Sequence, residues 1–212
     1  GFIAMVFICF GPYSPGNSWL RAGAVDSEAI AGGQWWRGVT ALTLHADFSH
    51  MASNFLFLTI IGGSVCRILG VGVGWGLILA SGFIGNTTLG LLASHQHLAV
   101  GASTACFGAL GLLTMNQVVE NFRQFGGWKS VWSRVWIPLL AGFALLGFLG
   151  SGPNSDITAH GFGFVAGLFL AIPVSIPKTR RASPWVQDVC KVGTVVLIMF
   201  AWHSAIQFAN VE

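Results

Sequence analysis

The succession of long apolar stretches in this chain limits its fold more than any other feature. Of its 212 residues, 54% are hydrophobic and 8% are charged. Ordinary soluble domains carry about 25% charged residues, and a helix needs roughly 20 apolar residues to cross a bilayer core. The sequence therefore predicts an integral, multi-pass membrane protein. Its net charge of +3 is too small and too scattered to suggest a nucleic-acid partner.

Seven membrane segments are expected between the Gly, Pro and charged residues that interrupt the apolar pattern. The first is too short to cross a bilayer, and we interpret it as the outer half of a helix truncated at its N-terminus. A long loop, 12–47, follows it and shows no obvious helix or strand pattern. The expected fold is an all-α bundle of transmembrane helices in a single membrane domain, 1–212. The segments lie near residues 1–11, 48–69, 71–93, 100–118, 135–151, 157–177 and 187–208.

The basic residues predict how the chain is oriented in the membrane. Lys and Arg accumulate in cytoplasmic loops, and only Arg21 and Arg37 fall on the side opposite to the other eight. The outward loops are therefore expected to be 12–47, 94–99 and 152–156. The eight on the cytoplasmic side are Arg67, Arg123, Lys129, Arg134, Lys178, Arg180, Arg181 and Lys191.

Four unusual polar residues are expected at the outward ends of their segments: His50, Asn54, Ser103 and His160. Polar groups within membrane spans are costly and usually mark function. Each also has a structural explanation, because an intramembrane serine can bond to a carbonyl in its own helix. A histidine can join two packed helices, and residues four apart on one helix can simply pair.

Together these residues can supply the groups that a serine protease needs. A serine hydroxyl becomes a nucleophile when a neutral imidazole removes its proton, which assigns Ser103 as nucleophile and His160 as base. His50, Asn54 and the backbone N–H of Ser103 are candidate donors to an oxyanion. Asp156 stands four residues before His160 and is interpreted as a helix cap, so the predicted site is a Ser-His dyad. Asp47 is expected to be a solvated loop charge.

These motifs resemble those of rhomboid intramembrane serine proteases. The resemblance runs from "WWRG" (35–38) to "GFVAG" (163–167) and includes "GASTACFG" (101–108), "AHGFGFVAG" (159–167) and the HxxxxHxxxN pattern that ends at Asn54. It implies six core helices plus a seventh, 187–208, and a protease that cleaves transmembrane segments of single-span proteins. The supporting residues implied by the resemblance are Gly101, Thr104, Phe107, Gly163, Gly167, His45, Trp36 and Arg37.

Two positions depart from the family pattern. Thr104 stands where the family usually has glycine after the nucleophile, and its branched side chain is expected to add bulk and stiffness beside the nucleophile, with an effect on oxyanion geometry and rate. Gln34 stands where many relatives have glutamate, so its contact within the outward loop is expected to be weaker. Phe107, one turn after Ser103, is expected to support the His160 ring.

The motifs typical of other intramembrane proteases do not occur in this sequence. The sequence has no HExxH or GxGD motif, and its four cysteines form no CxxC pair. A zinc site is one alternative, but neither a metal nor a cofactor is expected. The alternative function is an inactive rhomboid-like protein that binds and escorts membrane proteins, and a transporter is a third class. The expected location is a bacterial plasma membrane, with the site open to the extracytoplasmic side. The zinc ligands considered are His45, His50, His95 and His97.

Overall fold

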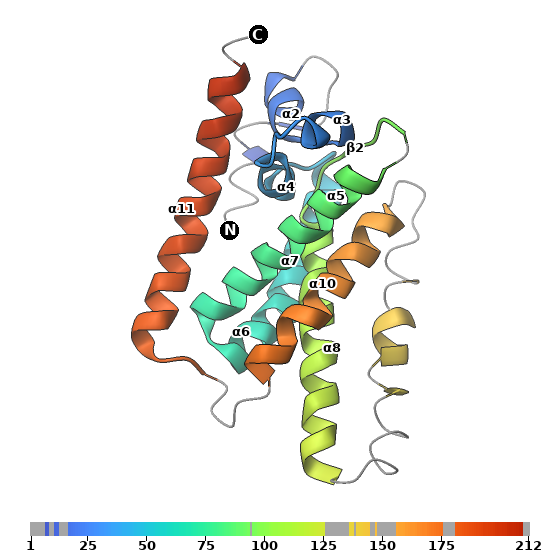
Figure 1. The fold of residues 1–212 in the computed structure, drawn as a ribbon, viewed down its shortest axis with the longest axis vertical. Helices are drawn as coiled ribbons and strands as arrows, with labels where there is room; N and C mark the ends of the chain where they lie inside the picture. The colour runs from blue at the N-terminus through green and yellow to red at the C-terminus, as the bar shows by residue number, and fades with distance from the viewer. Residues whose placement is uncertain are drawn as a thin grey trace.

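In the computed structural model, long helices lie side by side, and short helices cover one end of them (Figure 1). We call this covered end, at the top of Figure 1, the loop end. Most of the expected segment 1–11, including Cys9, and about half of the expected segment 135–151 lie outside the described residues. The described residues are 7–8, 11–12, 17–93, 95–125, 136–137, 139–144, 147, 156–175 and 181–209.

Within the described part of the chain, four helices are long and apolar enough to cross a membrane. The first, Phe48–Leu69, consists of α5 (Phe48–Phe57), one wider turn η2 (Leu58–Gly62) and α6 (Gly63–Leu69). The others are α7 (Val71–Leu92), α10 (Ile157–Ser175) and α11 (Pro184–Ala209). All four lie within a few residues of the segments that the sequence predicts, which confirms a helical, multi-pass membrane protein.

A fifth long helix, α8 (Ser103–Phe125), packs against α7 and α10 and extends well beyond the expected end at 118. Its second half is polar. It continues as a helix because side chains one turn apart bond to each other. Gln117 Nε2 donates to Asn121 Oδ1 at 3.0 Å, and Gln124 Nε2 donates to Glu120 Oε1 at 3.0 Å.

The loop 12–47 is folded, contrary to what its lack of pattern indicated. It contains α2 (Ser18–Gly23), β1 (Val25–Asp26), α3 (Ser27–Ala31), α4 (Arg37–Thr40) and η1 (Ala41–Thr43). Side-chain caps begin two of these short helices: Asn17 accepts from the Trp19 amide, and Asp26 accepts from the Ala29 amide. β1 pairs antiparallel with β2 (Leu98–Ala99). The pairing joins this loop to the segment that leads into α8.

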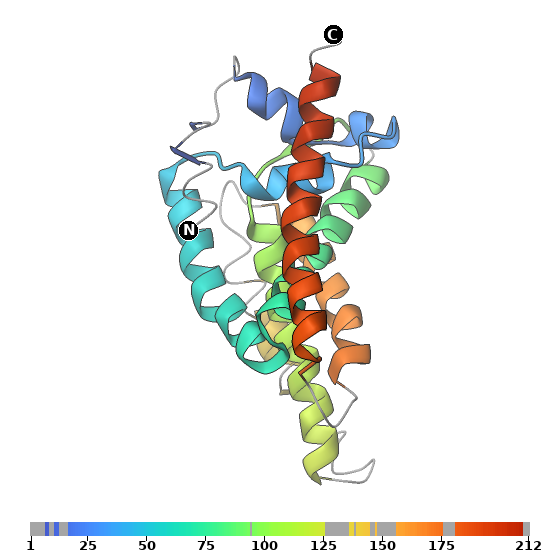
Figure 2. The ribbon, with the colours of Figure 1, turned by 90° about the vertical axis from the view of Figure 1, so that its left-hand side faces the viewer.

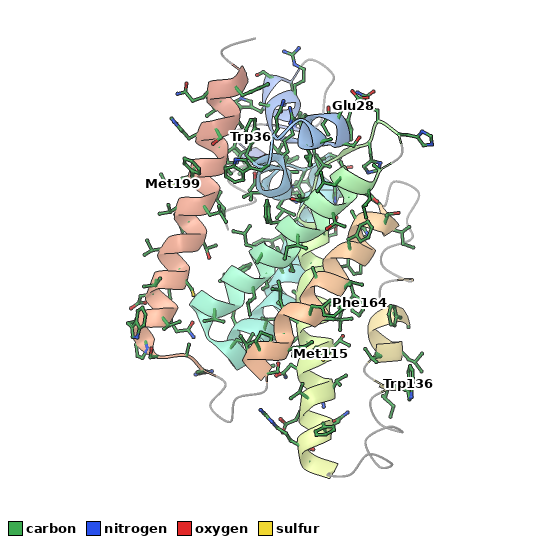
Figure 3. All side chains as sticks on the ribbon, in the orientation of Figure 1. Glu28, Trp36, Met115, Trp136, Phe164 and Met199 are labelled. Carbon is green, nitrogen blue, oxygen red and sulfur yellow. The ribbon has the colours of Figure 1, made fainter. Side chains whose placement is uncertain are left out.

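Helices α8 and α10 approach until their backbones touch. A Cβ placed on Gly163 would meet the Thr104 carbonyl group, and one on Gly167 would meet the Gly108 carbonyl group. Glycine at these positions is what permits such close packing. Farther along α10, the fully buried Phe164 ring packs on Phe143 at a centroid distance of 5.2 Å (Figure 3). The two helices therefore form one tightly packed pair.

Helix α11, which corresponds to the seventh expected segment, stands along one side of the bundle. This side is on the left in Figure 1 and faces the viewer in Figure 2. Gln187 near its start accepts from the Gly72 and Val73 amides at 2.9 and 3.1 Å and donates to the Leu69 carbonyl at 2.8 Å. The side chain thereby satisfies backbone groups at the α6–α7 turn. Much of the opposite face of α11 consists of exposed apolar side chains, as expected of a helix that faces lipid.

Candidate active site

Ser103 is the first residue of α8, and a tightly constrained turn precedes it. Gly101 has φ = +131°, which side-chain-bearing residues rarely adopt. A Cβ there would also lie 2.6 Å from His50 Cε1. The Gly101 amide donates to the Ala41 carbonyl at 2.9 Å, and the Ala102 amide donates to His45 Nε2 at 3.4 Å. The loop 12–47 thus holds the backbone on which Ser103 stands.

Two side chains of α5 face this turn. The Asn54 amide nitrogen lies 3.6 Å from the position of a Cβ on Gly101, and the His50 ring lies closer still. Asn54 is buried, and its Nδ2 has no hydrogen-bond partner among the described residues. A buried donor without a partner is uncommon and costly. The arrangement therefore leaves a free N–H beside the start of α8.

His45 and Asp47 lie just before α5 and hold its first turn. The rings of His45 and His50 meet edge to face, with centroids 5.4 Å apart. Burial, and next the nearby His50, lower the pKa of His45 to about 4, so its ring is neutral. Asp47 is exposed, but it is more than the solvated charge that was expected. It caps α5 by accepting from the Ser49 hydroxyl and the His50 amide, which lower the pKa of its carboxyl.

His160 lies in the first turn of α10 and is buried. Its ring packs on the Phe107 ring, with centroids 4.5 Å apart and planes inclined by 31°. Phe107 lies one turn after Ser103 on α8. Gly163, one turn after His160, lies against the Thr104 carbonyl group. The two backbones therefore meet at Thr104, directly after Ser103, and at Gly163, one turn after His160.

The Thr104 side chain directs its methyl group between helices. It is buried, and its Cγ2 lies 2.6 Å from the position of a Cβ on Gly85 and 3.0 Å from one on Gly163. It therefore points into the junction of α7, α8 and α10, whereas His50 and Asn54 face Gly101. The methyl group of Thr104 thus fills a space between helices, and the effect of this residue on rate stays a prediction.

The "QWWRG" segment organises the loop 12–47. Arg37 is buried, and its Nε donates to Gln34 Oε1 at 2.7 Å while its Nη1 donates to the Ala24 carbonyl at 2.9 Å. Gln34 therefore accepts a short hydrogen bond from Arg37, and its strength relative to a glutamate at this position stays a prediction. The Trp36 ring packs against Phe208 of α11 at a centroid distance of 5.5 Å (Figure 3).

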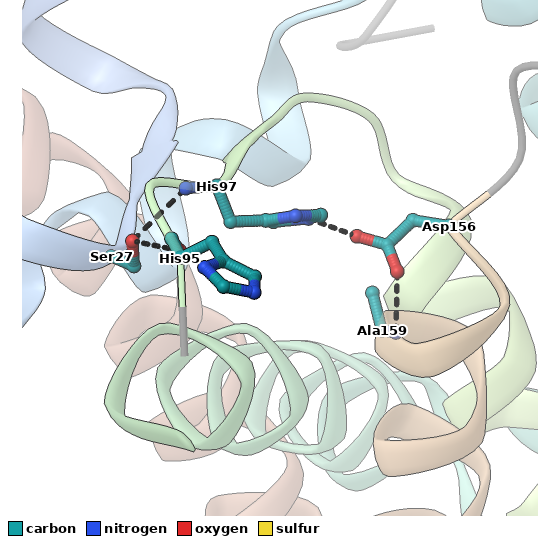
Figure 4. Close-up of polar contacts among 5 residues, drawn as sticks. All are labelled: Ser27, His95, His97, Asp156 and Ala159. Atoms are coloured by element: carbon teal, nitrogen blue, oxygen red, sulfur yellow. Dashed lines mark hydrogen bonds and ion pairs between the residues drawn. The ribbon is translucent and has the colours of Figure 1, made fainter. Parts of the chain in front are cut away.

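Sequence reasoning missed one contact near this site. Asp156 caps α10 as expected, because its Oδ1 accepts from the Ala159 amide at 2.9 Å. Its other oxygen, Oδ2, accepts from Nε2 of His97 at 2.5 Å (Figure 4). Of the histidines considered as zinc ligands, His97 makes this contact, whereas the His45 and His50 rings pack on each other. Across the described ranges, no group of three His, Cys, Asp or Glu side chains is placed to hold a metal ion.

The fold and this site define a class: a polytopic helical membrane protein in which a serine and a histidine begin two tightly packed helices. Comparison with known proteins names the family. Residues 32–177 match the model of the Rhomboid domain. The chain therefore belongs to the rhomboid family.

Individual relatives cover about three quarters of this chain. The rhomboid protease GluP of Bacillus subtilis is 31% identical over 156 residues, which are 74% of this chain and 29% of GluP. YdcA of the same organism is 32% identical over 152 residues, which are 72% of this chain and 73% of YdcA. RHOMBOID-like protein 5 of Arabidopsis thaliana is 30% identical over 151 residues, which are 71% of this chain and 47% of that protein.

Proposed function

We propose that this chain is an intramembrane serine endopeptidase that cleaves transmembrane segments of single-span proteins through a Ser103–His160 dyad. The observation that carries the proposal is the unpartnered amide of Asn54, which faces the turn before Ser103. A donor that the protein itself leaves unsatisfied fits an oxygen supplied by a substrate. Membership in a family that contains proteases supports the same chemistry.

In the proposed reaction, His160 takes the proton of the Ser103 hydroxyl as its oxygen attacks the scissile carbonyl carbon. The tetrahedral oxyanion accepts hydrogen bonds from Asn54 Nδ2, the His50 ring and the Ser103 N–H. His160 then gives its proton to the leaving amine. A water molecule, activated by the same imidazole, hydrolyses the acyl-enzyme and releases the second product. The Phe107 ring holds the imidazole in place during both proton transfers.

The substrate must expose a backbone carbonyl near the loop end. The amides of an intact helix are already bonded to each other, so residues that weaken a helix favour cleavage. In the proposed orientation the loop end faces the extracytoplasmic side of a bacterial plasma membrane, and water enters from there. Lipid surrounds the apolar outer faces of the helices.

Cleavage of a single-span reporter by the purified protein in liposomes tests the proposal. Ser103→Ala and His160→Ala should each abolish cleavage, and Asn54→Ala should lower kcat by about 10²–10³. Ser204→Ala and His203→Ala on the exposed part of α11 are matched controls and should cleave normally. Labelling of the wild type, but not of Ser103→Ala, by a fluorophosphonate gives a second measurement.

Full activity in Ser103→Ala or His160→Ala would refute the dyad. If the wild-type protein binds the reporter without cleaving it, the inactive, escorting alternative is favoured instead.

A further inference from the structure

From the contact between His97 and Asp156, we infer that these residues are a positioning pair for the proposed dyad. The pair would fix the first turn of α10, and with it His160, against the segment that carries Ser103. The inference rests on the proposed function. His97 lies six residues before Ser103, and Asp156 lies four residues before His160. The pair therefore joins the two parts of the chain whose relative position sets the geometry of proton transfer.

On the α10 side, Asp156 engages the first turn at two points. Its Oδ1 accepts from the Ala159 amide at 2.9 Å, and its backbone carbonyl accepts from the amide of His160 itself at 3.0 Å. Any displacement of Asp156 is therefore passed to the residue that bears the proposed base. The second carboxylate oxygen is the one that accepts from His97 (Figure 4).

On the other side, the backbone of His97 is held from both directions. The His97 amide donates to the Ser27 hydroxyl at 3.0 Å, and the Ser27 amide donates to the His97 carbonyl at 3.2 Å. The Ser27 hydroxyl also donates to the His95 carbonyl at 3.2 Å. Ser27 is buried and begins α3. The His97 ring thus extends from a backbone that is anchored to the folded outward loop.

The position of the pair indicates an effect on rate rather than on stability. Its side chains are 36% and 21% exposed, and such partly exposed polar contacts contribute little to the stability of a fold. The glycine contacts between α8 and α10 lie deeper, at Gly163 and beyond. At the helix ends, which fray most easily, the pair is a side-chain link between the two segments. Small displacements there matter because proton transfer depends on exact placement.

His97→Ala tests this role, because it removes the link and leaves the Asp156–Ala159 cap. We expect kcat on the single-span reporter to fall roughly 10- to 100-fold, with KM and the unfolding temperature in detergent nearly unchanged. Asp156→Ser keeps a capping oxygen but cannot reach His97, so it should behave in the same way. His97→Gln places an amide N–H near the position of Nε2 and should restore most of the rate.

His95→Ala is the matched control. It removes a neighbouring imidazole of the same loop and keeps the backbone carbonyl that Ser27 contacts, so kcat should equal that of the wild type. Amide hydrogen exchange gives a measurement that needs no activity. Exchange in 157–161 should be faster in His97→Ala than in the wild type, His97→Gln or His95→Ala.

Wild-type kcat and wild-type exchange in His97→Ala would overturn the inference. Loss of rate together with a lowered unfolding temperature, without rescue by His97→Gln, would show a merely structural role and would also overturn it. If the wild type and Ser103→Ala are equally inactive, the proposed function fails. The exchange measurement then decides separately whether the pair orders the start of α10, and unchanged exchange would refute that as well.

Discussion

The contact between α8 and α10 leads to a sharp prediction for Gly163→Ala. A Cβ at this position would lie 3.0 Å from both the carbonyl carbon and Cγ2 of Thr104, and closer still to the carbonyl oxygen. Backbone atoms cannot turn aside as a flexible side chain can. The two helices must therefore separate by something on the order of 1 Å before ordinary van der Waals contact is restored.

The expected loss of stability in Gly163→Ala follows from two opposing effects. Overpacking of this kind costs about 1–3 kcal/mol, and the better helix propensity of alanine offsets up to ~1 kcal/mol of that. For a protein of this size each kcal/mol lowers the unfolding temperature by about 2–4 °C. The effect on rate is larger, because His160 lies one turn away on the same helix and a misplacement of about 1 Å can cost 10²-fold.

Thermal unfolding in detergent and reporter cleavage in liposomes measure the two effects on one preparation. Gly161→Ala is the matched control, since a Cβ at that position would meet nothing within 4 Å. Gly167→Ala should reproduce the effect of Gly163→Ala, because its Cβ would meet the Gly108 carbonyl group. If Gly161→Ala and Gly163→Ala unfold at the same temperature and cleave at the same rate, the packing explanation is refuted.

Three further changes have defined outcomes. Thr104→Gly empties a space between helices, so it should lower the free energy of unfolding by roughly 1–3 kcal/mol without raising kcat; a faster enzyme of unchanged stability would contradict this. His45 has a pKa of about 4 when folded and 6.5 as its ordinary value. Below pH 6.5 the unfolded chain binds a proton that the folded chain does not, so the free energy of unfolding should fall by up to ~3 kcal/mol between pH 6.5 and 4. In His45→Gln this part of the difference between the free energies of unfolding at pH 7 and pH 4.5 should be absent. Gln187→Ala leaves three backbone groups unpartnered and should cost roughly 1–3 kcal/mol, whereas Gln207→Ala, exposed on the same helix, should unfold like the wild type.

The membrane helices could be predicted from the sequence because the length of an apolar run is a local property. The spans that contain His50 and His160 were located this way to within a few residues. The end of α8 could not be located in this way, because its polar half depends on pairs such as Gln117–Asn121 rather than on the length of an apolar run. The short helices of loop 12–47 also escaped prediction, since caps such as Asn17 and Asp26 act over a single turn.

The arrangement of the candidate site was predictable only in part. Motif spacing placed Ser103 and His160 at helix ends, but it says nothing of where the next side chain points. Successive residues on a helix differ by about 100° in direction, so Thr104 faces a different neighbour from Ser103. The His97–Asp156 contact joins residues 59 positions apart. The folded loop 12–47 holds His97 in this position, and no local sequence pattern predicts such a pair.

The glycine contacts between α8 and α10 have a mechanical consequence. Helices whose backbones already touch have no soft side-chain layer between them, so sliding or parting them requires moving two main chains at once. The parts of α8 and α10 that contain these glycine contacts therefore move together as one rigid unit. A substrate segment of the proposed protease must therefore enter by displacing elements other than these two helices.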